Sequence, residues 1–123
     1  MQDRNGNVQN TVEMTLADEP FAKIKSGQKT LEIRLYDEKR RAIKKGDILV
    51  LCRSNSPTEQ IRARVVALHP FNTFQELFES PLFFKTGCGD LTVDGAVQGM
   101  YRYYTRAQEE TFGVLGIEID PEI

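Results

Sequence analysis

Three ionisable side chains lie close together in the segment from Gly27 to Arg34. Lys29 supplies an ammonium group, Glu32 a carboxylate and Arg34 a guanidinium. A lysine and an arginine could hold phosphate, the arginine through two parallel hydrogen bonds. A carboxylate beside them could accept a proton from water or from a ribose 2′-hydroxyl group. Lys29 and Glu32 are therefore the candidate catalytic residues, and Lys29 and Arg34 are candidate ligand-binding residues.

A β-strand is expected to carry these groups. Between residues 29 and 36, Leu31, Ile33 and Leu35 alternate with polar residues, which is the pattern of a strand. Glu32 and Arg34 would then point from the same face, about 6.5 Å apart along the strand. Lys29 has the parity of the apolar face, but as the first residue of the strand it could curl over the edge.

The elements around this strand follow from hydrophobic patterns and turn residues. A helix is expected from Asp18, as its cap, to a stop at Gly27, with further helices after Thr73, Thr92 and Thr105. The other strands are expected at residues 11–16, 48–52, 61–68 and 114–119, and the middle two should pair as a hairpin. Strands and helices alternate without a βαβ rhythm, so the expected fold is α+β: a small, closed, mostly antiparallel β-barrel with flanking helices.

Length and composition favour one domain. With 123 residues and 40% hydrophobic residues, the chain can bury one continuous core. We expect a flexible leader over residues 1–10 and a single domain over residues 11–123. No stretch approaches the roughly 20 apolar residues of a membrane span, and the first ten residues lack the apolar core of a signal peptide. A cytoplasmic protein without a membrane partner is expected; the oligomeric state stays open.

The cysteine and histidine content argues against a disulfide framework or a zinc site. Cys52 and Cys88 are 36 positions apart, there is no C-x-x-C pair, and His69 is the one histidine. We therefore expect two reduced, structural thiols, no metal and no cofactor. His69, which precedes Pro70, is expected to be a turn residue.

Charge is distributed unevenly along the chain. The net charge is -2 with a pI of about 5.5, which argues against coating nucleic acid through bulk electrostatics. Residues 23–45 nevertheless contain nine basic and three acidic residues, a net +6, so the remainder carries -8. This basic segment includes Arg40 and Arg41, which we name as candidate nucleic-acid contacts. A basic segment of this kind is more often a solvated loop than a binding patch.

The segment Gly27-x-Lys29-x-x-Glu32-x-Arg34 fills every position of G-x-K-x-x-E-x-R, the signature of the ASCH domain family. The chain resembles this family of the PUA-like superfamily over about residues 12–119. Further similarity comes from residues 14–16, 44–48, 100–104 and 113–117. The resemblance implies a PUA-like β-barrel with a cleft between the first helix, the signature strand and the loop before the later long helix. It also implies RNA-related ligands.

Some ASCH relatives deacetylate N4-acetylcytidine with a lysine, a threonine three positions later and an acidic residue near the later helix. Here Lys29 matches the lysine, but Glu32 occupies the threonine position. Thr30 cannot replace it, because neighbouring strand residues point to opposite faces, and Asp90 is the nearest acid by position. The resemblance therefore implies a cleft but not this particular reaction.

Other relatives bind single-stranded nucleic acid or cleave RNA. Tyr36 and Tyr103 could stack on bases, worth about 1 to 3 kcal/mol per base, whereas Tyr101 and Tyr104 are in register for a helix core. Phe83 and Phe84 could form a lid, although core packing is the simpler interpretation.

Three function classes stay open. The first is an RNA- or nucleotide-binding domain with RNA processing as an option, and the second is an amidohydrolase acting on an acylated nucleoside. The third is a non-catalytic regulatory module that recognises a protein or a metabolite. Independently of these classes, Glu32 and Arg34 could form only a structural ion pair at the rim of the barrel.

Overall fold

The computed structural model describes residues 9–122. The leader expected over residues 1–10 therefore lies almost entirely outside the described residues. The elements in chain order are β1 (Thr11–Leu16), α1 (Asp18–Ser26), β2 (Leu31–Leu35), α2 (Glu38–Arg41), β3 (Ile48–Arg53), β4 (Ser56–Phe71), α3 (Phe74–Glu79), the 3₁₀ helix η1 (Pro81–Lys85), α4 (Val93–Met100), α5 (Arg106–Phe112) and β5 (Val114–Glu122).

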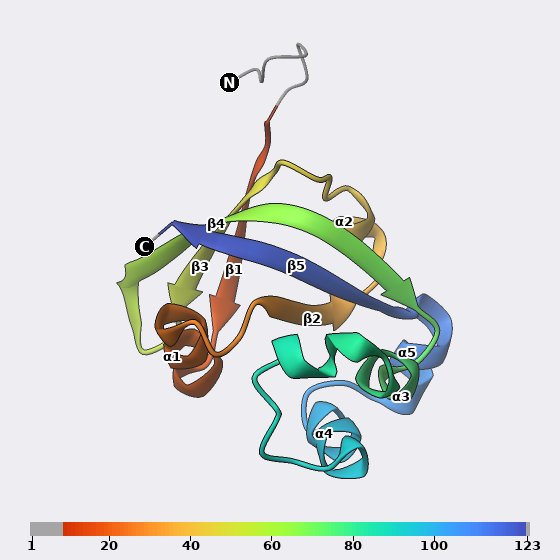
Figure 1. Cartoon of the computed structure of the whole chain (residues 1–123). Helices are drawn as coiled ribbons and strands as arrows, with labels where there is room; N and C mark the ends of the chain where they lie inside the picture. Colours follow the sequence, from red (N-terminus) through yellow and green to blue (C-terminus); the bar gives the residue numbers. More distant parts are fainter. Residues whose placement is uncertain (1–8, 123) are drawn as a thin grey trace.

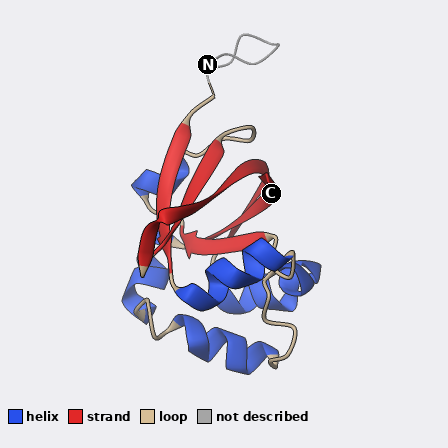
Figure 2. Ribbon diagram, turned by 90° about the vertical axis from the view of Figure 1, so that its left-hand side faces the viewer, coloured by secondary structure: helices blue, strands red, loops and turns tan. Residues whose placement is uncertain are grey.

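The five strands form one mixed sheet in the order β1-β3-β4-β5-β2. β1 and β3 are parallel, and the other three neighbouring pairs are antiparallel. The expected α+β class, the mostly antiparallel sheet and the hairpin of β3 with β4 are thus confirmed. The barrel is a half-barrel rather than a closed one: β1 and β2 are its two edges, and no ladder joins them within residues 9–122. Figure 1 shows β4 and β5 running side by side across the molecule, and in Figure 2 most of the helices lie below the curved sheet.

Strand β4 is longer than the hydrophobic pattern predicted. Its first part pairs with β3 and its second part with β5, and the register shifts between Val65 and Ala67, which is a bulge that helps a strand to bend. The prediction that His69 is a turn residue is wrong, because His69 lies within β4 opposite Gly116. The following Pro70 is tolerated since β3 pairs with β4 only as far as Arg64, so one side of β4 is free of a ladder there.

The helices begin and end largely where their capping residues predicted. Gly27 ends α1 with φ at 86°, and the Thr92 and Thr105 side chains cap α4 and α5. At α1 the prediction needs a correction: the cap position is Ala17, and the carboxylate of Asp18 instead accepts a hydrogen bond from Arg53 at 2.8 Å.

Two hydrophobic clusters hold the sheet and helices together. One packs α1 into the curved sheet and centres on Ile24, Leu49 and Leu51. The other packs α3 and α4 against β2, with Leu31, Phe74 and Leu77 fully buried. The apolar residues of β2 belong to this second cluster, and on the same strand Glu32 is buried and Arg34 is partly buried.

Candidate functional site

A cleft of about 470 Å³ opens beside β2, at the seam between the two sheet edges. The end of β1, helix α1, strand β2, the loop that follows η1, helix α4 and the turn after it contribute its walls. This is where the family resemblance placed a cleft. Apolar atoms dominate the walls, which include Leu16, Pro20, Ile33, Cys88, Leu91, Ala96, Met100 and Tyr104. A volume of this size is in the range of small-molecule sites.

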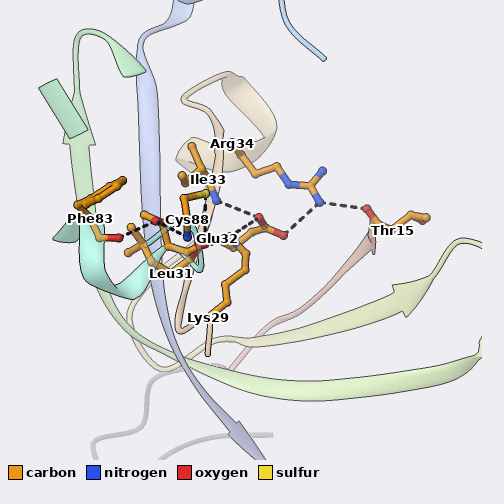
Figure 3. A network of polar contacts seen from close by, with 9 residues as sticks. Thr15, Lys29, Leu31, Glu32, Ile33, Arg34, Phe83 and Cys88 are labelled. Atoms are coloured by element: carbon orange, nitrogen blue, oxygen red, sulfur yellow. Dashed lines mark hydrogen bonds and ion pairs between the residues drawn. The ribbon is translucent and has the colours of Figure 1, made fainter. Parts of the chain in front are cut away.

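Glu32 and Arg34 lie side by side in this cleft. Arg34 Nη2 is 3.6 Å from Glu32 Oε2 and donates a hydrogen bond to the carbonyl oxygen of Thr15 at 3.1 Å. Figure 3 shows the guanidinium of Arg34 between the Glu32 carboxylate and Thr15. The ion pair of Glu32 with Arg34, which is one of the two interpretations of these residues, is thus present, and the hydrogen bond from Arg34 to Thr15 links β2 to β1.

Lys29 lies just ahead of β2 and turns its side chain into the protein. Its Nζ atom donates to the carbonyl oxygens of Leu31, at 2.7 Å, and Thr86, at 3.3 Å, and lies 3.6 Å from Glu32 Oε1. Lys29 is only 6% exposed. Three acceptors thus surround an ammonium group that has three N–H bonds, so Lys29 chiefly organises the floor of the cleft.

The loop after η1 packs tightly against this lysine. Gly87 has φ at +78°, and a Cβ atom there would lie 3.1 Å from Lys29 Cβ and 3.2 Å from Lys23 Cδ. The carbonyl oxygen of Gly87 accepts a hydrogen bond from Lys23 Nζ at 2.7 Å. Glycine is the residue that fits both the positive φ and the close approach.

One oxygen of Glu32 has no hydrogen-bond partner in the part of the chain that the structure describes. Oε1 accepts the backbone N–H of Ile33 at 3.0 Å. Oε2 is enclosed and accepts no hydrogen bond from the described residues, with the Arg34 contact longer than a hydrogen bond. A buried carboxylate oxygen left in this state costs free energy, of the order of 1 to 3 kcal/mol.

Arg102 and Tyr103 form the mouth of the cleft. Tyr103 is 71% exposed, and Arg102 is exposed and makes no ion pair within residues 9–122. Deeper in, Tyr104 stacks on Phe74 with ring centroids 5.8 Å apart. Burial raises the pKa of Tyr104 above its ordinary value of 10.0, against the opposite influence of Arg34, so its hydroxyl group is neutral near pH 7.

The structure gathers some of the candidate residues and separates others. Lys29, Glu32, Arg34 and Tyr103 all line the cleft. Tyr36, Arg40 and Arg41 do not: the Arg41 guanidinium covers the Tyr36 ring at 4.1 Å, and both of these residues line a second, separate groove. Arg40 instead forms an ion pair with Asp37 at 3.2 Å.

Other predictions about side chains can be judged from the same geometry. Tyr101 and Tyr104 pack on the core, as expected. Phe83 also packs there, but Phe84 is 82% exposed, and neither phenylalanine lines the cleft. Cys52 and Cys88 are free, which agrees with the expected absence of a disulfide framework.

Sequence reasoning missed the parts of the cleft that come from distant segments. Arg102, Cys88 and Gly87 line it together with Lys23. The glycine pair Gly87 and Gly89 was the one local signal for a loop with a special backbone. Thr30 and Asp90, the substitutes considered for a deacetylase, are not among the lining residues.

Two negative observations apply to the part of the chain that the structure describes. No group of three or more His, Cys, Asp or Glu side chains is arranged to hold a metal ion. None of the helices in that part is long and apolar enough to cross a membrane.

Comparisons with known proteins identify the family. The model of the ASCH domain matches residues 14–123. The chain therefore belongs to the ASCH domain family, which has the PUA-like fold.

Three solved structures resemble this one. The crystal structure of hypothetical protein PH0355 is 32% identical and has a TM-score of 0.80, over 90% of this chain and 98% of that one. The solution structure of protein PF0455 from Pyrococcus furiosus is 34% identical with a TM-score of 0.70, over 91% and 97% of the two chains. An ASCH protein from Zymomonas mobilis, 16% identical, has a TM-score of 0.61 over 90% of this chain and 67% of its own, and supports the fold alone. None of the curated proteins matches this chain.

Proposed function

We propose that this ASCH domain binds single-stranded RNA or a nucleotide in the cleft beside β2. The observation that carries the proposal is the pairing of apolar walls and exposed Tyr103 with the cations Arg34 and Arg102 in one cleft of about 470 Å³. Nucleotides have flat apolar faces and anionic phosphates, and aromatic faces combined with cations are how proteins recognise single strands.

The local charge supports this proposal although the whole chain is acidic. The charged residues that line the cleft are Lys23, Lys29, Arg34 and Arg102 against Glu19 and Glu32, a net +2 in a chain of net charge -2. Lys23 is already engaged with Glu19, at 3.2 Å, and with the Gly87 carbonyl group. Arg102 is therefore the lining cation best placed to contact a phosphate.

The direct test is binding of a fluorescently labelled single-stranded RNA at several salt concentrations. Wild type should bind, and affinity should fall as salt rises because phosphate contacts release counterions. Arg102→Ala should weaken binding and reduce the salt slope by about one unit. Arg64→Ala is the matched control, since Arg64 is an exposed cation on the sheet that does not line the cleft. Absence of binding to RNA and to mononucleotides, or an equal effect of the control, would refute the proposal.

Tyr36, Arg40 and Arg41 stay predicted contacts. Because they do not line the cleft, we expect Arg41→Ala to weaken binding of an oligonucleotide without affecting a mononucleotide. Equal weakening of both would contradict this assignment.

A second candidate function is hydrolysis in the same cleft, of RNA or of an acylated nucleoside. The buried Oε2 atom of Glu32, which accepts no hydrogen bond from the described residues, favours it, because such an oxygen could take a proton from an attacking water molecule once the Arg34 guanidinium shifts aside. Turnover of RNA or N4-acetylcytidine that is lost in Glu32→Gln, with binding retained, would support an enzyme. Binding without turnover in wild type would leave the domain a binding module.

A further inference from the structure

The unpartnered oxygen of Glu32 constrains which part of a nucleotide can occupy the floor of the cleft. Glu32 is 95% buried, and none of residues 9–122 donates a hydrogen bond to its Oε2 atom. A ligand that donates an N–H there would remove the cost of the unsatisfied carboxylate. A phosphate would instead place a second negative charge against it.

Arg34 supplies hydrogen-bond donors next to the acceptor oxygen of Glu32. Its Nη2 atom is 3.6 Å from Glu32 Oε2 and is held by the carbonyl oxygen of Thr15. The guanidinium has five N–H donors, and within residues 9–122 the Thr15 carbonyl oxygen is the one hydrogen-bond acceptor that they reach. The floor of the cleft therefore offers an acceptor next to a donor. A small displacement of the guanidinium, whose contact with Oε2 is longer than a hydrogen bond, would expose that oxygen.

Lys29 is poorly placed to bind a phosphate at the floor of the cleft. Its Nζ atom donates hydrogen bonds to the carbonyl oxygens of Leu31 and Thr86 and forms an ion pair with Glu32 at 3.6 Å, so the ammonium group is already engaged inside the protein. A phosphate would have to displace at least one of these internal acceptors and leave it buried without a donor, which is costly. Arg102, which is exposed at the mouth of the cleft, makes no ion pair within residues 9–122 and could contact a phosphate without losing one.

We propose that the floor of the cleft recognises the edge of a nucleobase, with an N–H of the base donating to Glu32 Oε2 and the adjacent base acceptor binding Arg34. The phosphate then lies outside, at Arg102. This inference rests on the proposed function. It deepens that function by stating that the base, rather than the phosphate, occupies the floor of the cleft. The apolar walls formed by Ile33 and Met100 suit the faces of a heterocycle.

The test compares nucleosides that differ only in the donor group. Calorimetry on wild type should give weaker binding of N4,N4-dimethylcytidine than of cytidine, and of 3-methyluridine than of uridine, by about tenfold to a hundredfold, as expected for one hydrogen bond to a charged group. 5-Methylcytidine, which adds bulk but keeps the donors, should bind like cytidine. Ribose 5-phosphate and inorganic phosphate should not compete.

The variant Glu32→Gln tests the same contact from the protein side. Its amide oxygen should remain on the Ile33 N–H, so an NH₂ group would face Arg34 and the distinction between donor-bearing and methylated nucleosides should disappear. Glu79→Gln is the matched control, because Glu79 is an exposed acid on α3 that does not line the cleft. Since the nucleoside comparison uses wild type, it decides the matter even if Glu32→Gln folds poorly.

The outcomes separate this inference from the function on which it rests. Equal binding of methylated and unmethylated nucleosides, or displacement of cytidine by phosphate, would overturn the base-edge inference while RNA binding could still stand. Absence of binding to RNA, nucleotides and nucleosides alike would overturn both.

Discussion

Arg34 on β2 joins the two edges of the half-barrel, because its Nη2 atom donates a hydrogen bond to the Thr15 carbonyl oxygen on β1 at 3.1 Å. The same guanidinium lies against the buried carboxylate of Glu32. One side chain thus bridges the seam of the sheet and also lines the candidate binding site. The family signature therefore has an architectural role, to which the proposed function adds ligand binding.

Loss of this contact should destabilise the fold. Arg34→Ala removes the bridge to Thr15 and leaves the Glu32 carboxylate with one cation fewer, so we expect a loss of about 2 to 3 kcal/mol in the free energy of unfolding, measured in urea. Arg62→Ala is the control, since Arg62 forms only an exposed pair with Glu122 at 3.8 Å, and its effect should stay within about 0.5 kcal/mol. Similar values for both variants would contradict the role of Arg34 at the seam.

Gly87 should tolerate no side chain. In Gly87→Ala, the positive φ and the approach to Lys29 and Lys23 within 3.1 and 3.2 Å require the loop to shift. We expect a stability loss of about 1 to 3 kcal/mol by thermal or urea unfolding, with weaker ligand binding because the loop lines the cleft. Gly89→Ala is the matched control: a Cβ atom there meets nothing within 4 Å. A Gly87→Ala protein as stable as the control would show that the loop accommodates the methyl group.

Tyr103 should contribute to RNA binding through stacking and little to stability. Its ring is 71% exposed, so Tyr103→Ala should leave the midpoint of thermal unfolding nearly unchanged while weakening RNA binding by about 1 to 3 kcal/mol. Phe84→Ala removes another highly exposed aromatic ring that lies outside the cleft, and binding should survive it. An equal loss in both variants would indicate that exposed aromatic surface in general, rather than the cleft, holds the RNA.

Glu118 should make stability depend on pH in the acid range. Its carboxylate accepts hydrogen bonds from Lys85 and bonds to His69, both at 3.0 Å. The hydrogen bond from Lys85, which has the larger effect, and the contact with His69 hold the pKa of Glu118 below its ordinary value of 4.5. Since the folded pKa is the lower one, the contribution is complete above pH 4.5 and is lost as pH falls through the folded pKa, where the folded protein also takes up the proton.

Urea unfolding of wild type and Glu118→Gln at several pH values measures this linkage. The difference in stability between the two proteins should be constant near neutrality and shrink below pH 4.5. Glu79→Gln, a change at an exposed acid on α3 that bonds only to Gln75, should show no such convergence. A difference that persists unchanged into strong acid would exclude Glu118 as its source.

The sequence by itself determined the local structure and the family. Hydrophobic alternation predicted β2, capping residues predicted α4 and α5, and the spacing of Lys29, Glu32 and Arg34 identified the ASCH signature. These features depend on residues close together in the chain. Local patterns therefore record them directly.

The tertiary structure alone decided what those residues contact. Parity suggested that Lys29 and Glu32 would diverge, but Lys29 precedes the strand and bonds to Thr86, 57 positions away. Similarly, Pro70 suggested a turn near His69, yet β4 continues because its free side needs no N–H there. The cleft is lined by segments from β1 to the turn after α4. Contacts between such distant segments produce no hydrophobic periodicity within any one of them, so the sequence pattern could not predict them.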